Sequence, residues 1–412
     1  MTGLRLAIVA GTVAGGTGQH AAMLARGCAA QGVSVRVLAP ESARSLFTAG
    51  PGCPPEEQGP SAGPAPLFLP VEIGDRPRPV RDLAAVVRAR RMLAGTDVVH
   101  AHGLRAGGLA AVATLALGRS RAGRGPARTP GSARRRARRA PALLVTVHNA
   151  APPGAAQRAA YRILERIVAC RADSVLCASA DLADRMRRLG ARSVSRAVVA
   201  AHRPGHRAPP PGEIERLRAS LGAQGRPLVL AAGRLAWQKG YDVLLAAARR
   251  WQCRDPLPRL VIAGDGPLAA TLAASIRLTG ADVLLLGYRT DLPSLLTAAD
   301  VVVVPSRWEA RALIVQEAQL AGRPIVASRV GGISELTGAG GALLVPPGDP
   351  AALAGAVLAV LDDAGLAARL AEASRALAAR LPSEADAVAA ALAEYRRLAA
   401  GRSGAPAALA GS

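Results

Sequence analysis

Short runs of Val, Leu and Ile alternate with longer Ala-, Leu- and Arg-rich segments of helical periodicity along most of this 412-residue chain. Most runs are apolar at consecutive positions, as strands are when helices cover both faces of their sheet. A repeated strand–helix order builds a parallel sheet from βαβ units. The pattern therefore predicts an α/β protein with doubly wound, Rossmann-like sheets.

The apolar runs form two series with a proline-rich segment between them. The predicted strands are residues 4–11, 34–39, 68–73, 97–102, 143–148, 174–179 and 197–202, followed by 227–234, 260–264, 282–287, 300–306, 324–328 and 342–346. The segment between the series begins RPGHRAPPPG, which is typical of a linker. We expect two tandem domains, 1–203 and 204–400, with a ligand cleft between them and a disordered tail over 401–412.

Two further stretches are predicted to be irregular. Residues 49–66 are rich in Pro and Gly and are expected to form a surface loop. Residues 119–139 hold nine arginines and no acidic residue, which predicts a solvated basic insertion in the first domain.

The charge balance is strongly basic, with 52 Lys and Arg against 29 Asp and Glu, yet Lys239 is the single lysine. Aromatic residues make up only 2% of the chain, so the platforms on which nucleic-acid bases stack are scarce, and we do not expect a nucleic-acid partner. The apolar runs are shorter than the ~20 residues that span a bilayer. Five cysteines without a CxxC or Cys/His spacing fit reduced thiols in the cytoplasm and predict no metal site.

A glycine-rich turn, Gly15-Gly16-Thr17-Gly18, follows the first predicted strand and opens a helix. Glycines at such a turn let backbone N–H groups approach an anion at a helix N-terminus. The turn fits only the looser dinucleotide fingerprint, and the nearest candidate for its acidic partner, Glu41, lies beyond Pro40. A tight turn without a ligand is an equal alternative.

The lone lysine marks a second candidate site. Gly233-Arg234 ends the first strand of the second domain, and Lys239 precedes the next helix. Anions bind where a strand's carboxyl end meets a helix N-terminus. A compact ammonium at Lys239 and a guanidinium at Arg234 could hold a diphosphate from two sides. The alternative, a solubilising lysine, is weak in a chain with no other lysine.

Two glutamates, Glu309 and Glu317, follow the strand predicted over 300–306. If the residues between them were all helical, they would lie ~12 Å apart. Glycosidase carboxylates that act on one bond lie only ~5–9.5 Å apart. This pair is therefore expected to hold opposite ends of one elongated ligand.

Three histidines, His100, His102 and His148, fall at predicted strand ends that face the expected cleft. A lone buried histidine is more often a structural hydrogen-bonding group than a catalyst, and we interpret His100 and His102 in this way. His148 stands in the sequence TVHN.

The motifs occur in a recognisable order. They are GGTGQH, HAHG, TVHN, GRLAWQKGYDVLLAA, AGDGPL, LGYRTDLPSLLTAADVVVVPS, the pair Glu309-x7-Glu317, GRPIVASRVGGISELT and LLVPPGDPAALA. Together they resemble the family 4 retaining glycosyltransferases of the GT-B fold. The resemblance extends from about residue 4 to about residue 362 and is densest between 228 and 349.

On the donor side, the resemblance implies that Arg234 and Lys239 bind the diphosphate of a nucleotide-sugar and that Glu317 holds its ribose. The implied substrate is a UDP- or GDP-linked sugar, with no separate cofactor and no metal. Domain closure would exclude water.

The remaining roles concern the sugar and the acceptor. The resemblance implies catalytic roles beside the donor sugar for Glu309 and His148, and it places Gly15 and Gly16 on the acceptor side. Where the family usually has Gly-Phe-Gly after the first glutamate, this chain has Ala310-Arg311-Ala312, followed by Leu313. The loop expected to face the donor sugar and phosphate thus carries a cation, Arg311, which could bind an anionic group.

The sequence is also compatible with other functions. A nucleotide-sugar epimerase or hydrolase would share the donor site, and a degenerate scaffold could serve as a non-catalytic Arg-rich, anion-binding protein. The basic insertion and an i, i+4, i+8 stripe at Arg158, Arg162 and Arg166 suggest peripheral association with the anionic inner face of a membrane and a lipid-linked or cell-envelope acceptor. A solvated cationic insertion is an equal alternative.

Overall fold

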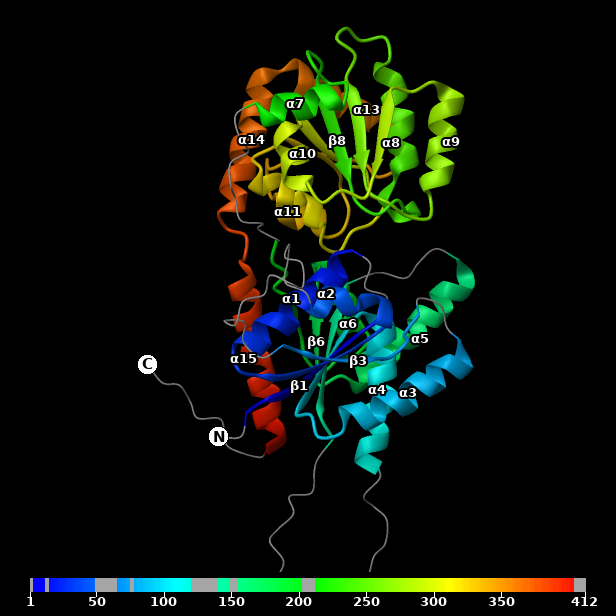
Figure 1. Ribbon diagram of the computed structural model, residues 1–412, viewed down its shortest axis with the longest axis vertical. Coiled ribbons are helices and arrows are strands. Elements are labelled where there is room, and N and C mark those ends of the chain that lie inside the picture. Colours follow the sequence, from blue (N-terminus) through cyan, green and yellow to red (C-terminus); the bar gives the residue numbers. More distant parts are fainter. Residues whose placement is uncertain are drawn as a thin grey trace, which may run out of the picture. The chain divides into compact units, whose positions relative to one another are not determined.

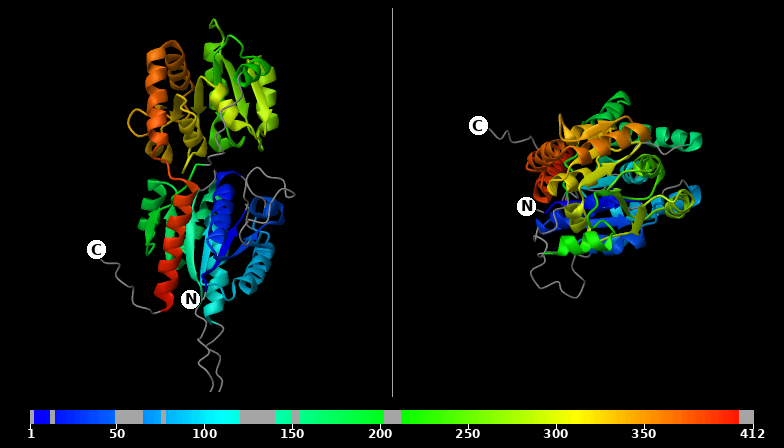
Figure 2. Two further views of the ribbon diagram at one scale, coloured as in Figure 1. Left: turned by 60° about the vertical axis from the view of Figure 1, so that its left-hand side comes forward. Right: turned by 90° about the horizontal axis from the view of Figure 1, so that it is seen from above.

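The fold is described from a computed structural model, for residues 3–11, 15–48, 65–74, 78–119, 140–148, 154–201 and 212–403. The chain divides into two compact units. Unit 1 comprises Met1–Val199 and Glu384–Ser412, and unit 2 comprises Ala200–Ser383. Figures 1 and 2 show each unit as a sheet covered by helices.

Unit 1 contains a seven-stranded parallel sheet in the order β3-β2-β1-β4-β5-β6-β7. Its strands are β1 (Arg5–Ala10), β2 (Ser34–Ala39), β3 (Leu67–Pro70), β4 (Val98–His102), β5 (Ala142–Val147), β6 (Ser174–Cys177) and β7 (Val194–Arg196). Its helices are α1 (Gly16–Ala30), α2 (Arg44–Thr48), α3 (Pro79–Leu93), α4 (Leu104–Arg119), α5 (Ala155–Arg171), α6 (Ala180–Arg188) and α15 (Glu384–Ser403). The central strands β4 and β5 are buried along their whole length.

The strand order of unit 1 reverses between β1 and β4, and this reversal distributes its helices. Right-handed crossovers on either side of the reversal place helices on opposite faces of the sheet. One face carries α3, α4 and α5, packed in that order, and the other carries α1, against which α15 packs. The carboxyl ends of β1, β4 and β5 meet at one edge, where ligands bind in such sheets.

Unit 2 contains a six-stranded parallel sheet in the order β10-β9-β8-β11-β12-β13. Its strands are β8 (Leu228–Ala232), β9 (Arg259–Ala263), β10 (Val283–Gly287), β11 (Val301–Val304), β12 (Ile325–Ser328) and β13 (Leu343–Val345). Its helices are α7 (Glu213–Ser220), α8 (Tyr241–Ala248), α9 (Ala269–Thr279), α10 (Leu292–Ala298), α11 (Leu313–Leu320), α12 (Gly332–Thr337), α13 (Pro350–Asp362) and α14 (Ala364–Ala378).

Alternate residues of the strands in unit 2 face two separate cores. Along β11, Val301 and Val303 pack with one hydrophobic cluster, while Val302 and Val304 pack with the other. This two-sided burial is what a continuous apolar run predicts for a central parallel strand. The prediction of two doubly wound parallel sheets is confirmed.

Helix ends in unit 2 follow elementary capping chemistry. Asp349 accepts hydrogen bonds from the N–H groups of Ala351 and Ala352, and Pro350 occupies the first turn of α13. Asp363 accepts from the N–H of Leu366 at the start of α14. These caps satisfy backbone donors that have no partner within their own helix.

The structure corrects three boundaries predicted from the sequence. The strand predicted over 197–202 is wrong, because the seventh strand, β7, ends at Arg196 and residues 197–201 form no strand. The second domain ends at Ser383 rather than at residue 400. The helix α15 belongs to unit 1 because its buried residues pack on α1, and it continues through the first three residues of the predicted tail, to Ser403.

Some predictions fall on other parts of the chain. Most of the predicted loop 49–66, the basic insertion beyond Arg119 and the tail beyond Ser403 lie outside the described residues. In the described part of the chain, no single helix is both long and apolar enough to cross a bilayer. The helices α13 and α14 meet that test only as a pair, and they are bent by 100° at their junction.

Candidate functional site

Loops that follow four strands of unit 2 are hydrogen-bonded to one another at the carboxyl edge of its sheet. The N–H of Leu235 donates to the carbonyl of Asp265 at 2.8 Å, joining the loops after β8 and β9. The N–H of Arg307 donates to Gln238 O at 2.7 Å, and the N–H of Gly332 donates to Glu309 O at 2.9 Å. The loops after β8, β9, β11 and β12 therefore form one fixed backbone layer.

Two glycines in this layer have a backbone conformation that other residues rarely adopt. Gly240 has φ +68°, and a Cβ built on it would lie 2.1 Å from the carbonyl oxygen of Pro305. Gly331 has φ +43°, and its Cβ would lie 2.0 Å from Glu309 O. Only glycine allows both the positive φ and these close approaches, so these residues set the spacing of the loops.

The ammonium of Lys239 is paired with the carboxylate of Glu309. Lys239 Nζ donates to Glu309 Oε1 at 2.5 Å, and the Ser306 hydroxyl donates to the same oxygen at 2.8 Å. The Glu309 side chain is 6% exposed and that of Lys239 is 23% exposed. The lone lysine thus occupies a specific, partly buried position, and the structure brings it together with Glu309. The two residues were expected to have separate roles, and their contact was not predicted from the sequence.

Arg234 projects from the same loop as Lys239 and is exposed. The adjacent residue Gly233 lies close to the lysine, because a Cβ built on it would be 3.7 Å from Lys239 Cε. The hydroxyl of Tyr241 donates to Gly233 O at 3.0 Å. Burial and the nearby charge of Glu309 raise the pKa of Tyr241, so it stays a neutral donor that fixes this loop.

A second ion pair, which was not predicted from the sequence, holds the loop that carries Lys239. The guanidinium of Arg307 binds both carboxylate oxygens of Asp242, at 2.7 and 2.6 Å, and lies 5.0 Å from the centre of the Trp237 ring. The hydrogen bonds from Arg307 lower the pKa of Asp242. In the sequence, Arg307 stands out only because it lies two residues before Glu309. That position does not reveal its partner Asp242, which lies 65 residues earlier.

The segment after Glu309 leads into α11. Ala310 and Ala312 are buried, at 3% and 1% exposure, while Arg311 is half-buried between them. Ala312 caps α11, and Leu313 is the first residue of that helix. Because the helix starts only at Leu313, the ~12 Å spacing of a continuous helix does not apply to Glu309 and Glu317. Glu317 lies within α11 and is half-buried.

In unit 1, Gly15 and Gly16 lie where α1 begins. Gly15 is the N-cap residue, with φ +80°, and a Cβ on it would meet no atom within 4 Å. The positive φ, rather than crowding, therefore explains the glycine. The residues between Gly11 and Gly15 lie outside the described part of the chain.

Four histidines form a buried cluster at the carboxyl edge of the unit 1 sheet. His102 Nδ1 lies 3.2 Å from His148 Nε2, and the two rings are stacked with centroids 5.5 Å apart. His100 lies 2.6 Å from both the Tyr395 hydroxyl of α15 and Thr146 Oγ1. His20, on α1, contacts His102 and His148 edge-on.

This burial makes the histidines weak bases. Desolvation, reinforced by the neighbouring imidazoles, lowers the pKa of His100 to about 3 and keeps those of His102 and His148 well below the usual value. His100 has both ring nitrogens hydrogen-bonded, as expected for a structural histidine. His20 was missed as a cluster member, although it stands in the GGTGQH motif.

Solved structures and family models identify the fold. Over 95% of this chain and 99% of that chain, the structure matches HepE from Anabaena in complex with UDP and glucose, with a TM-score of 0.72 and 19% identity. Residues 15–202 match the model of the glycosyl transferase 4-like domain, and residues 226–363 match that of glycosyl transferases group 1. The chain thus has the GT-B fold, and two glycosyltransferase family models together cover most of it.

Curated proteins are similar over part of the chain. Alpha-D-kanosaminyltransferase from Streptomyces kanamyceticus is 35% identical over 161 residues, which is 38% of this chain and 42% of that protein. Glycogen synthase from Mycobacterium tuberculosis is 38% identical over 165 residues, or 38% of this chain and 39% of that protein. The match thus spans about two fifths of the length of these curated relatives.

Sucrose-phosphate synthase from Thermosynechococcus elongatus has the same GT-B fold. Its structure matches with a TM-score of 0.70 and 21% identity, over 97% of this chain and 100% of that chain. In the described residues of this chain, no group of three or more His, Cys, Asp or Glu side chains is arranged to hold a metal ion.

Proposed function

We propose that this protein transfers a sugar from a nucleoside-diphosphate donor to an acceptor, with retention of configuration. The observation that carries the proposal is the Lys239–Glu309 pair beside the exposed Arg234, at the carboxyl edge of the unit 2 sheet. Anionic ligands bind at this edge in doubly wound sheets. The UDP bound to the structurally similar HepE supports a UDP-linked sugar, and GDP is the alternative base.

The two cations would stabilise the leaving group. As the bond between the sugar C1 and the diphosphate oxygen breaks, negative charge develops on the diphosphate and positive charge on the sugar. Fixed cations aimed at this developing charge usually make the largest contribution to the rate. A lysine ammonium has three donors, so Lys239 can keep its bond to Glu309 and still donate to phosphate oxygens.

The carboxylates and the loop would orient the donor. Glu309 uses Oε1 for both Lys239 and Ser306, and we assign Oε2 to a hydroxyl of the donor sugar. Glu317 would hold the ribose hydroxyls. The backbone N–H groups at the start of α11 and the guanidinium of Arg311 would face the sugar or phosphate, together with Ala312 and Leu313.

On the acceptor side, His148 would contact the transferred sugar and Gly15 and Gly16 would border the acceptor. The low pKa keeps the His148 imidazole neutral at pH 7, so it serves as a hydrogen-bonding group rather than a cation. In the same-face mechanism, the acceptor hydroxyl attacks C1, and its proton passes to an oxygen of the departing diphosphate. No metal is required, because Arg234 and Lys239 neutralise the leaving group.

We propose a lipid-linked or cell-envelope acceptor, taken from the cytoplasmic face of a membrane. The exposed stripe of Arg158, Arg162 and Arg166 on α5 supports an anionic surface as partner. A second candidate is a small aminocyclitol, favoured by the relative named 2-deoxystreptamine N-acetyl-D-glucosaminyltransferase from Streptomyces fradiae, which is 37% identical over 160 residues, or 37% of this chain and 38% of that protein.

The stereochemistry is tested by following the donor with proton NMR. In the absence of acceptor, slow hydrolysis of an α-linked UDP-sugar should release the α-anomer first, and EDTA should leave the rate unchanged. Release of the β-anomer would contradict retention, and loss of turnover in EDTA would contradict metal independence. Formation of an epimeric UDP-sugar, without release of UDP, would instead identify an epimerase.

A further inference from the structure

The outward face of α3 is apolar where a helix on the surface of a protein is usually polar. Its inward side buries Ala85, Ala89 and Leu93. On the outward side, Val80 is 83% exposed, Leu83 is 65% exposed and Val87 is 48% exposed. The helix therefore carries apolar side chains on both sides, but only those on the inward side are buried within unit 1.

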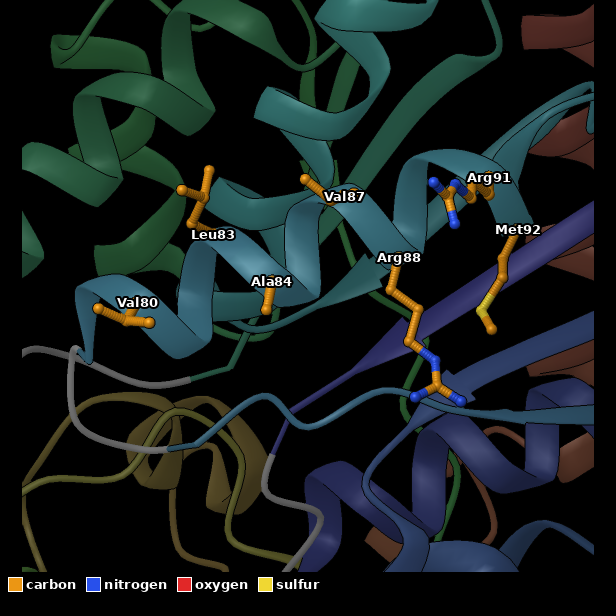
Figure 3. A pocket seen from close by; sticks show the side chains of 7 residues that line it. All are labelled: Val80, Leu83, Ala84, Val87, Arg88, Arg91 and Met92. Atoms are coloured by element: carbon orange, nitrogen blue, oxygen red, sulfur yellow. The ribbon is translucent and has the colours of Figure 1, made fainter.

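These side chains line an open hollow along the helix. The hollow has a volume of about 690 Å³, and it is lined by Val80, Leu83, Ala84, Val87, Arg88, Arg91 and Met92 (Figure 3). Arg88 and Arg91 are exposed. An apolar strip with arginines beside it is the composition of a helix that lies in the headgroup region of a bilayer.

The neighbouring helices of the same layer also expose aliphatic side chains. The helix α4 packs beside α3, and α5 packs beside α4 (Figure 1). Val112 of α4 is 45% exposed and Ile163 of α5 is 61% exposed. Single exposed aliphatic residues are ordinary, but this layer has five of them on three adjacent helices.

The same three helices present positive charge without an unpaired carboxylate in their described residues. Their two acidic residues are Asp82, which binds Arg105 at 2.8 Å, and Glu165, whose side chain is 3% exposed and binds Arg185 at 2.7 Å. The exposed arginines are Arg81, Arg88 and Arg91 on α3 and Arg158, Arg162, Arg166 and Arg171 on α5.

We propose that the outward face of α3, α4 and α5 docks on an anionic lipid bilayer, with Val80, Leu83 and Val87 entering the headgroup region. Each arginine near an anionic surface adds to the attraction, and the apolar side chains add a contribution that salt does not screen. A second copy of this chain fits the face less well, because a two-fold contact would set the same arginines against one another. The choice of a bilayer rests on the proposed lipid-linked acceptor.

The test is co-sedimentation of the full chain with vesicles of phosphatidylcholine and of equal parts phosphatidylcholine and phosphatidylglycerol. We expect binding to the anionic vesicles only. The double variant Leu83→Gln/Val87→Gln should weaken this binding about tenfold, and Arg81→Gln/Arg88→Gln/Arg91→Gln should weaken it about a hundredfold. All five side chains are exposed, so circular dichroism should report an unchanged fold.

A matched control is Arg277→Gln/Leu278→Gln, since unit 2 exposes an arginine and a leucine (88% exposed) at these positions of α9. It should bind vesicles like the wild type. Wild-type binding in both α3 variants, or equal binding to neutral vesicles, would overturn the proposal. So would a wild-type dimer, seen by analytical ultracentrifugation, that Leu83→Gln/Val87→Gln converts to a monomer. Donor hydrolysis without vesicles should be unchanged in all variants. If the wild type does not hydrolyse the donor, that result contradicts the proposed glycosyl transfer but not the docking on a bilayer.

Discussion

Replacing Lys239 by alanine is expected to lower donor turnover by about a thousandfold, or about 4 kcal/mol of transition-state stabilisation. The reason is that Lys239 is the cation fixed closest to Glu309, and no other lysine in the chain can replace it. The measurement is the initial rate of UDP or GDP release from the nucleotide-sugar. Arg277→Ala, which removes an exposed cation from α9 of the same unit, should leave that rate unchanged.

A second variant separates loss of charge from loss of fold. Lys239→Ala leaves the buried Glu309 carboxylate without its ion pair, which can cost stability. Lys239→Gln keeps an N–H donor for Glu309 but removes the charge, so it should fold and still lose turnover to a similar extent. Fluorescence of Trp237, Trp251 and Trp308, all in unit 2, reports whether the unit is folded. Full turnover in folded Lys239→Gln would refute the assignment.

Mild acid should destabilise unit 1 before unit 2. His100, with a pKa of about 3 in the folded state, and His102 and His148, with pKa values well below the usual one, stay neutral when buried. In the unfolded chain they take up protons near pH ~6.5. Their stabilising contribution is therefore complete above pH ~6.5 and is lost as the pH falls. Each such group lowers the free energy of unfolding by up to about 1.4 kcal/mol per pH unit as the pH falls below ~6.

The two units provide an internal comparison for this acid effect. All four histidines of the described residues lie in unit 1, and all three tryptophans lie in unit 2. In urea titrations at pH 7 and pH 5, part of the circular dichroism should be lost at a lower urea concentration at pH 5, while the tryptophan transition moves little. The variant His100→Gln should reduce the pH dependence by about 1.4 kcal/mol per pH unit. Equal shifts of both signals would contradict this origin.

The sequence predicted the sheets well because their signal is local. The apolar runs identified twelve of the thirteen strands, since a strand buried on both faces needs consecutive apolar residues whatever its partners are. The seventh strand, Val194–Arg196, was misplaced because its residues are half-buried or exposed and carry no such run.

The place of α15 could not be predicted in the same way. We predicted that α15 belongs to the second domain because it follows that domain in the sequence. It packs instead on α1, which lies more than 350 positions earlier. Gly27 of α1 makes room for Val388, since a Cβ at Gly27 would lie 2.3 Å from Val388 Cγ2. No local pattern carries information about a partner so distant in sequence.

The candidate site was predicted as a list of residues rather than as an arrangement. Lys239 stood out because the chain has no other lysine, and Glu309 because it follows a strand. Their direct contact, and the Ser306 hydroxyl that shares the Glu309 oxygen, depend on how the loops after β8 and β11 meet. That meeting depends on Gly240 and Gly331, whose positive φ values no spacing rule reveals.

Differential scanning calorimetry with UDP, GDP, ADP and their sugar-linked forms measures whether Lys239 forms part of a nucleoside-diphosphate site. One nucleotide series, at about a hundredfold excess over its Kd, should raise the melting temperature by about 5 °C or more. The same ligands should give no increase with Lys239→Gln. If no nucleotide raises the melting temperature of the wild type, or if Lys239→Gln responds equally, a nucleoside-diphosphate site built around Lys239 is ruled out.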